Sequence, residues 1–155
     1  MNSKAVFAGT FDPFTLGHYD IARRASNLFD KVYIAVADTQ SKNVAFSLEK
    51  RIEIAKLSLK DLDNVVVVPF SGFLVDFMKA NGIKTMVRGL RNTIDFEYEK
   101  SLFSVYKSQY DEVEACYLMS SNDDAHISSS LVREVLSLGG NPSAYLRKDA
   151  LKEIL

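Results

Sequence analysis

The 155-residue sequence predicts an α/β protein with a Rossmann-like, doubly wound five-stranded parallel sheet and helices on both faces. Short apolar runs alternate with segments of helical periodicity from one end of the chain to the other. The first apolar run also leads through a glycine-containing turn into a helix, which is the unit that α/β proteins use to hold phosphate groups. No repeat, low-complexity tract or linker divides the sequence, so we expect one domain over residues 1–155.

The first half of the chain is expected to form three strands and three helices. The run at residues 32–37 is continuous and largely β-branched, which is typical of a strand covered on both faces. Ser47 is a suitable N-cap, because Glu49 then lies in the first turn, where the helix dipole favours an anion. The expected elements are a strand at 5–8, a helix at 17–29, a strand at 32–37, a helix from Ser47 to Leu59, a strand at 65–68 that Pro69 ends, and a short helix at 73–78 that stops at Asn81-Gly82.

The second half continues the alternation and ends in helices. The expected elements are a strand at 85–87, a basic turn at 88–91, a helix at 93–106, a strand at 113–119, a polar loop at 120–126, a helix from Ser128 to Gly139-Gly140, and a last helix at 148–155. Ligands of doubly wound sheets bind at the carboxyl ends of the strands, where the strand order reverses. Because the segments at 9–18, 88–91 and 120–130 all leave such ends, we expect them to form one site.

Composition restricts the possible partners. The net charge is −1 and the isoelectric point is about 6.1, so the sequence has no broad basic surface for nucleic acid or anionic membranes. The single cysteine, Cys116, cannot form an intrachain disulfide and is expected to be a reduced, buried thiol. No apolar run suits a signal peptide or a membrane span. We therefore expect a soluble, cytoplasmic protein without a nucleic-acid or membrane partner.

The first turn carries the strongest chemical signal. Gly9 and Gly17 allow close approach of a ligand to the backbone, and Thr10 adds a hydroxyl group. His18 at a helix N-terminus suits a neutral imidazole that donates to an anion, although it could instead cap its own helix. Asp12 precedes a proline and is given a structural role as a turn residue.

Later segments add groups that bind phosphate, each with a simpler alternative. Arg88 and Arg91 suit bidentate phosphate contacts, or are solvated surface arginines. The serines at 128–130 with Arg133 offer donors at a helix start, or merely an N-cap. Lys42, Glu99 and His126 give little signal alone, and two histidines with one cysteine do not indicate a metal site on protein side chains. No P-loop, nucleophile elbow or dinucleotide fingerprint is present, so the residues alone indicate a phosphate-rich ligand and no particular reaction.

Together these segments resemble the phosphopantetheine adenylyltransferase family of the nucleotidyltransferase superfamily. The similarity covers nearly the whole chain and rests on five stretches: Gly9-Thr10-Phe11-Asp12-Pro13 with Thr15-Leu16-Gly17-His18, Ser41-Lys42 followed by Phe46-Ser47-Leu48-Glu49, Arg88-Gly89-Leu90-Arg91, Asp95-Phe96-Glu97-Tyr98-Glu99, and Ile127-Ser128-Ser129-Ser130-Leu131-Val132-Arg133. Two positions depart from the family pattern. Residues 122–126 replace a loop that often carries Lys or Glu and an aromatic residue, and Asn43-Val44 stands where Lys-Pro is common.

The resemblance implies transfer of the adenylyl group of ATP to 4′-phosphopantetheine, which gives dephospho-coenzyme A and pyrophosphate. It implies that the catalytic residues are Thr10, His18, Lys42 and Arg91, and that phosphopantetheine contacts Thr10, Lys42, Leu74 and Arg88. The implied ATP-binding residues are Thr10, Phe11, His18, Gly89, Leu90, Arg91, Glu99, Asp124, Ala125, His126, Ile127, Ser128, Ser129 and Ser130. It also implies Mg²⁺ held mainly through the ATP phosphates, and a homohexamer.

The attacking group in this reaction is itself a phosphate monoester. Its second pKa of about 6 leaves it mostly dianionic at neutral pH, so in-line attack needs no general base. Two alternatives remain open at this point. Another phosphate, such as nicotinamide mononucleotide or glycerol phosphate, could be the acceptor, or the chain could be a non-catalytic nucleotide-binding module. A class I tRNA synthetase shares the first motif, but this chain is too short and insufficiently basic to support that role.

Overall fold

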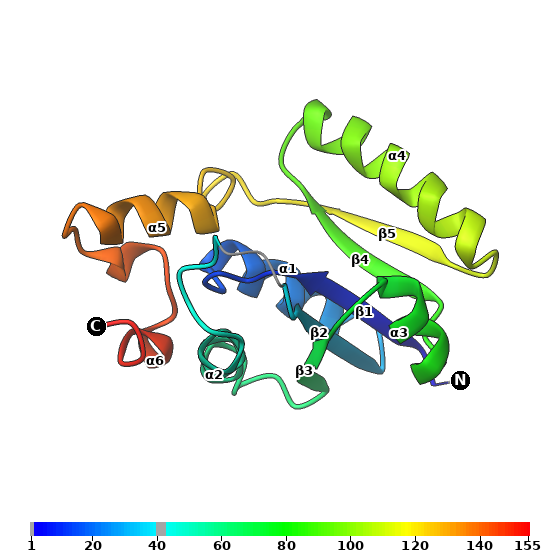
Figure 1. Ribbon diagram of the computed structural model, residues 1–155, viewed down its shortest axis with the longest axis horizontal. Coiled ribbons are helices and arrows are strands. Elements are labelled where there is room, and N and C mark those ends of the chain that lie inside the picture. Colours follow the sequence, from blue (N-terminus) through cyan, green and yellow to red (C-terminus); the bar gives the residue numbers. More distant parts are fainter. Residues whose placement is uncertain (1, 40–42) are drawn as a thin grey trace.

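The computed structural model describes residues 2–39 and 43–155 as alternating strands and helices (Figure 1). The strands are β1 (Lys4–Gly9), β2 (Lys31–Ala37), β3 (Val65–Phe70), β4 (Thr85–Leu90) and β5 (Glu114–Met119). The helices are α1 (Leu16–Ser26), α2 (Leu48–Ser58), α3 (Leu74–Asn81), α4 (Thr93–Gln109), α5 (Ser129–Ser137) and α6 (Lys148–Leu151), with a short 3₁₀ helix at Pro142–Ala144. The strands pair in parallel in the order β3-β2-β1-β4-β5, which confirms the predicted fold class.

Two apolar layers cover the sheet, one on each face. On one face, Phe7 and Ile34 belong to a core that includes buried residues of α1, α2 and α6. On the other face, Val6 and Ala35 alternate with them and pack in a core with α3, while α4 contributes partly buried aromatic side chains. Figure 1 shows α4 running along β4 and β5, with α5 and α6 at the opposite end of the molecule from α3. None of the described helices is long and apolar enough to cross a bilayer.

The strand order reverses between β1 and β4. β1 pairs with β2 over six residues, from Lys4↔Lys31 to Gly9↔Val36. It pairs with β4 at only two positions, Ala5↔Thr85 and Val6↔Met86, so the paired ladder stops well before the carboxyl ends of these strands. Open α/β sheets bind their ligands at such a reversal.

Two strand boundaries differ from the predicted ones. β3 continues through Pro69 to Phe70, because β3 is an edge strand and a proline there need not donate to a second neighbour. β4 extends to Leu90 instead of ending at residue 87, because its ladder with β5 continues to the pair Leu90↔Met119. Arg88, Gly89 and Leu90 are therefore strand residues, and only Arg91 of the predicted basic turn lies beyond the strand.

Helix ends were predicted less accurately than helix starts. The N-caps Ser47 and Ser128 are confirmed, and Gly82 closes α3 with a left-handed φ of 63°. α1 ends at Ser26 instead of residue 29, because Asn27 caps it through its backbone N–H. The last helix covers Lys148–Leu151 alone. Cys116 is a free thiol as expected, but it is only half-buried on the edge strand β5.

Candidate active site

A cleft of about 530 Å³ lies where β1 and β4 end, and all three predicted segments line it. Its lining includes Thr10, Phe11 and His18 of the first turn and α1, Arg88, Gly89, Arg91 and Glu99 of β4 and α4, and Asp124, Ile127, Ser128, Ser129 and Ser130 of the last loop. A second hollow of about 340 Å³ shares Thr10, Asp12 and Arg133 with it. The Thr10–Asp12 turn therefore borders two hollows.

This turn adopts an unusual backbone conformation. Phe11 has a φ of +50°, which places a bulky residue in the left-handed region at a cost of roughly 1–3 kcal/mol. Its ring is 3% exposed and packs edge-on against Phe7 and His18, with ring centroids 5.3 and 5.0 Å apart. A Cβ atom at Gly9 would approach the Phe11 ring to 3.2 Å, a tight contact that would make the ring shift, so glycine suits this position.

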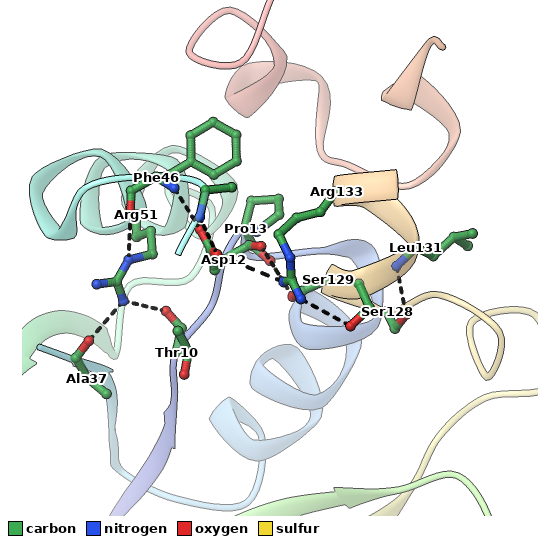
Figure 2. A network of polar contacts seen from close by, with 12 residues as sticks. Thr10, Asp12, Pro13, Ala37, Phe46, Arg51, Ser128, Ser129, Leu131 and Arg133 are labelled. Carbon is green, nitrogen blue, oxygen red and sulfur yellow. Dashed lines mark hydrogen bonds and ion pairs between the residues drawn. The ribbon is translucent and has the colours of Figure 1, made fainter. Parts of the chain in front are cut away.

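Polar contacts from distant segments hold the turn in place, as Figure 2 shows. The Asp12 carboxylate, 3% exposed, accepts hydrogen bonds from the backbone N–H groups of Ala45 and Phe46 at 2.8 and 2.9 Å. Arg133 of α5 donates to the Asp12 carbonyl at 2.8 Å, and the Ser129 hydroxyl donates to the Pro13 carbonyl at 2.8 Å. The structural role predicted for Asp12 is confirmed.

His18 caps α1 and also lines the cleft, so the predicted cap is confirmed and donation to an anion stays a prediction. Its Nδ1 accepts a hydrogen bond from the Thr15 N–H at 3.0 Å, while the Thr15 hydroxyl accepts from the His18 N–H. Burial and, secondarily, the charge of Arg91 lower the pKa of His18 to about 4. The imidazole is therefore neutral at pH 7, and with Nδ1 acting as acceptor its proton is on Nε2.

Arg88 bridges β4, α4 and β1. It donates to both carboxylate oxygens of Glu99, at 2.8 Å from Nε and 2.6 Å from Nη2, and its Nη1 reaches the Ala8 carbonyl at 3.2 Å. Burial opposes the charge of Arg88, but the hydrogen bonds and charge of Glu99 outweigh it and raise the pKa of the guanidinium. The arginine and carboxylate implied to bind different substrates thus form one ion pair.

Arg91 is held by an acidic residue that sequence reasoning missed. Its backbone N–H and its Nε donate to the same oxygen of Asp95, at 2.9 and 3.2 Å. Burial alone would raise the pKa of Asp95, but the hydrogen bonds that its carboxylate accepts from Arg91 outweigh burial and lower this pKa. The i,i+4 spacing of the pair was a usable signal. Tyr98 and Ser120 also line the cleft; both lie in stretches that the sequence analysis singled out, but neither was given a role of its own.

The helix starts of α1 and α5 both border the cleft. Ser128 caps α5 by accepting from the Leu131 N–H at 3.1 Å, and the cleft includes Ser128, Ser129 and Ser130. A Cβ atom at Gly17 would lie 3.5 Å from the Ile127 carbonyl oxygen, so the start of α1 packs against the loop that precedes α5. Two helix N-termini thus contribute positive potential to one cleft, which suits a polyanionic ligand.

Some predicted site residues do not line the cleft. Leu74 is 4% exposed and packs in the core beneath α3, and Leu90 is 6% exposed. Ala125 is half-buried and His126 is exposed, and neither contributes to the lining. Lys42 lies outside the described residues.

Comparisons with known proteins show which family the chain belongs to. Residues 6–135 match the model of the cytidylyltransferase-like family. Phosphopantetheine adenylyltransferases of Campylobacter concisus and Nautilia profundicola are 46% and 42% identical over 154 residues, which is 99% of this chain and 99% and 100% of those proteins. This chain belongs to the phosphopantetheine adenylyltransferase family. A third member, from Campylobacter fetus, is 45% identical and covers 99% of this chain and 97% of its own.

The fold of the family is also found in a more distant protein. A crystal structure from Vibrio parahaemolyticus, described as a candidate nicotinate-nucleotide adenylyltransferase, superposes with a TM-score of 0.75 at 20% sequence identity. It covers 99% of this chain and 92% of that protein. At this identity the likeness concerns the fold alone.

Proposed function

We propose that this chain transfers the adenylyl group of ATP to 4′-phosphopantetheine and releases pyrophosphate, a step of coenzyme A biosynthesis. The observation that carries the proposal is the convergence of the first turn, Arg91 and the serine loop on one cleft, in a chain that matches the named relatives end to end. The Thr10–Asp12 turn borders two hollows, which suits two polyanionic substrates whose phosphates must meet.

We infer direct in-line attack by the acceptor phosphate without a general base. The second pKa of a phosphate monoester, about 6, makes the acceptor a dianion at neutral pH. His18, with a pKa of about 4, is too weak a base to assist and is instead a neutral donor through Nε2. Its role is to stabilise charge on the phosphates, together with Thr10, Arg91 and the helix N-termini.

We assign the substrates to the two sides of the turn as the family pattern implies. The adenosine and phosphates of ATP would contact Gly89, Arg91 and the loop that ends in Ser130, while phosphopantetheine would contact Thr10 and Arg88. Lys42 is included in the acceptor site on the sequence pattern alone. Leu74 is likewise included on the sequence pattern alone, since in the structure it packs in the core away from the cleft.

Mg²⁺ fits this cleft as an ion carried by the phosphates. The described residues contain no group of three His, Cys, Asp or Glu side chains that could hold a metal. Near the cleft, Asp12, Asp95 and Glu99 already accept hydrogen bonds from protein donors. Phosphate oxygens and water would therefore supply the ligands, and Thr10, His18 and Arg91 would hold the ion indirectly. When bound, Mg²⁺ would neutralise part of the phosphate charge.

We further propose a homohexamer in the cytoplasm. Support for assembly comes from α4, where Ile94, Tyr98 and Val105 form an apolar stripe and are 80, 65 and 49% exposed. Large apolar side chains gathered on one helix face are characteristic of surfaces that contact another protein.

The decisive experiment is pyrophosphate release by the purified protein with ATP and Mg²⁺. Release should depend on 4′-phosphopantetheine and should be much slower with nicotinamide mononucleotide or glycerol phosphate. Absence of turnover with phosphopantetheine, or preference for another acceptor, would reject the assignment.

A second measurement separates an enzyme from a nucleotide-binding module. His18→Ala removes the Nε2 donor and should lower kcat by roughly 10²–10³-fold, by analogy with the loss of one oxyanion-hole donor. Affinity for ATP should change little, since contacts to the base and ribose remain. A variant with wild-type turnover would contradict the catalytic role of His18.

A further inference from the structure

Arg51 of α2 is a buried arginine directly behind the Thr10–Asp12 turn. It is 1% exposed, yet it does not line the cleft. Within the part of the chain that the structure describes, its guanidinium donates to backbone carbonyls alone, as Figure 2 shows: from Nη1 to Thr10 at 2.7 Å and Ala37 at 2.8 Å, and from Nε to Phe46 at 3.1 Å. A single side chain therefore ties together the first turn, the end of β2 and the segment before α2.

This burial is costly and is not offset by an opposite charge. Within residues 2–39 and 43–155, Arg51 makes no ion pair with a carboxylate, whereas Arg88 and Arg133 each lie near one. A buried cation without a counter-ion is unfavourable, and here its hydrogen bonds to three backbone carbonyls offset that cost. The contribution of Arg51 therefore lies in the segments that these carbonyls belong to.

The contact with Thr10 falls at the strained point of the turn. Among the described residues, Phe11 is the one non-glycine residue with a positive φ. Arg51 holds the carbonyl of the residue before it, and Arg133 holds the carbonyl of Asp12 after it, at 2.8 Å. Two arginines from different helices thus hold the carbonyls of the two residues on either side of Phe11.

The same contacts close a ring between the turn and the segment before α2. The Phe46 N–H donates to the Asp12 carboxylate at 2.9 Å, and the Phe46 carbonyl accepts from Arg51. Movement of either segment would break a hydrogen bond of a buried group. The turn is consequently positioned through α2 as well as by its own sequence.

We propose that Arg51 is a positioning residue for adenylyl transfer, which sets the Thr10–Asp12 turn in the conformation that brings Thr10 and the turn's backbone to the reacting phosphates. This inference rests on the proposed function. Errors of about 1 Å in the placement of reacting groups can cost on the order of 10²-fold in rate, so loss of this support should appear mainly in kcat.

The test compares three variants of the full chain. Arg51→Met removes every hydrogen-bond donor but keeps a side chain of similar length. Arg51→Lys keeps a cation that can donate to the carbonyls of Thr10 and Ala37 but cannot also reach the Phe46 carbonyl. Ser58→Ala is the matched control, because Ser58 is fully buried on the same helix and donates only to Ile54. For each we would measure kcat, ATP affinity by direct binding, thermal unfolding, and amide hydrogen exchange of a peptide covering residues 9–16.

Arg51→Met should lower kcat about 100-fold with less than a threefold change in ATP affinity. It should also speed exchange in residues 9–16, and Arg51→Lys should be intermediate in both respects. Ser58→Ala should lower the unfolding temperature while kcat and exchange of this peptide stay near wild type. If Arg51→Met does not fold, Arg51→Lys decides by the same measurements.

Three results would overturn the proposal: kcat within twofold of wild type in the folded Arg51 variants, an equal loss of kcat in Ser58→Ala, or failure of both Arg51 variants to fold. The last result would assign Arg51 to fold stability. If the wild-type protein turns over no phosphopantetheine, the proposed function is refuted. Hydrogen exchange does not depend on catalysis, so the exchange data would still show whether Arg51 holds the turn in place.

Discussion

His18 shows how one residue acquires its chemistry from its neighbours. Its sequence position at the start of a helix suggested either a cap or a ligand donor, and the structure shows a cap whose side chain also lines the cleft. The Thr15 N–H occupies Nδ1, and burial with the nearby Arg91 disfavours the cation, so the pKa of His18 is held at about 4. A permanently neutral imidazole can donate to phosphate without titrating near pH 7.

The pKa of His18 predicts a pH dependence of stability. Because the folded pKa, about 4, lies below the ordinary value of 6.5, the unfolded chain binds more protons between these values. The free energy of unfolding should therefore fall as pH drops from 6.5 towards 4, by about 1–3 kcal/mol from this residue. Above pH 6.5 His18 should add nothing to the pH dependence of the free energy of unfolding, because it is neutral in both states.

Denaturant titrations of wild type and His18→Gln at pH 7 and pH 4.5 measure this. Glutamine can still accept from the Thr15 N–H but cannot be protonated, so the variant should lose less stability on acidification. Equal losses in the two proteins would contradict the low pKa.

The ion pair between Arg88 and Glu99 makes a second prediction at this scale. Their side chains are 22 and 10% exposed, so removing one partner leaves a poorly solvated charge. Glu99→Gln and Arg88→Met should each destabilise the fold by about 2 kcal/mol, and the double variant by less than the sum. Chemical denaturation of the four proteins measures the coupling energy. A value near zero would mean that solvent screens the pair.

Among the elements, the helix starts divide into those that face the cleft and those that do not. α5 begins at the cleft with Ser128 as its cap, while α2 begins with Ser47, which does not line it. The two caps have the same geometry, since each serine hydroxyl accepts from the backbone N–H three residues later, at 3.1 and 3.2 Å. Comparing Ser128 with Ser47 therefore distinguishes the contribution of a cap to stability from its contribution to ligand binding.

Ser128→Ala and Ser47→Ala should each lower the free energy of unfolding by about 1 kcal/mol. Only Ser128→Ala should also weaken ATP binding, because it disturbs donors that face the phosphates. Calorimetric unfolding and ATP titration of both variants provide the measurement. Weakened binding in Ser47→Ala to the same degree would show that the effect is general destabilisation.

For the whole molecule, the arrangement of helices leaves α4 exposed. It lies along β4 and β5 (Figure 1), and its outward stripe of Ile94, Tyr98 and Val105 is largely exposed. Tyr98 also lines the cleft, so contact with a second chain along this stripe would occur beside the candidate site.

If the proposed hexamer forms through this stripe, Ile94→Glu should shift the mass from six times the 17.4 kDa chain towards smaller species. The introduced charge would have to be desolvated in the interface. Light scattering after size-exclusion chromatography measures the mass, with Leu28→Glu, another exposed apolar position, as the control. A wild-type monomer, or an unchanged assembly in Ile94→Glu, would reject α4 as the contact.

The sequence was sufficient for features that depend on neighbouring residues. Strand and helix periodicity predicted the parallel sheet, and the caps Ser47, Ser128 and Gly82 follow from local backbone chemistry. The convergence of three segments on one cleft also followed, because parallel strands direct their carboxyl ends to one edge. Errors arose where a ladder to another strand decided the boundary, as at Pro69 and at residues 88–90.

Only the tertiary structure decided which partners these residues have. No pattern in the sequence indicated that Arg88 would pair with Glu99, or that Arg51 would be buried among carbonyls behind the first turn. Such contacts join residues 11 to 41 positions apart, and their energies depend on burial that the whole fold creates. The sequence by itself determined the sheet, the helix starts and the motifs at its edge; packing determined which charges are free to meet a phosphate.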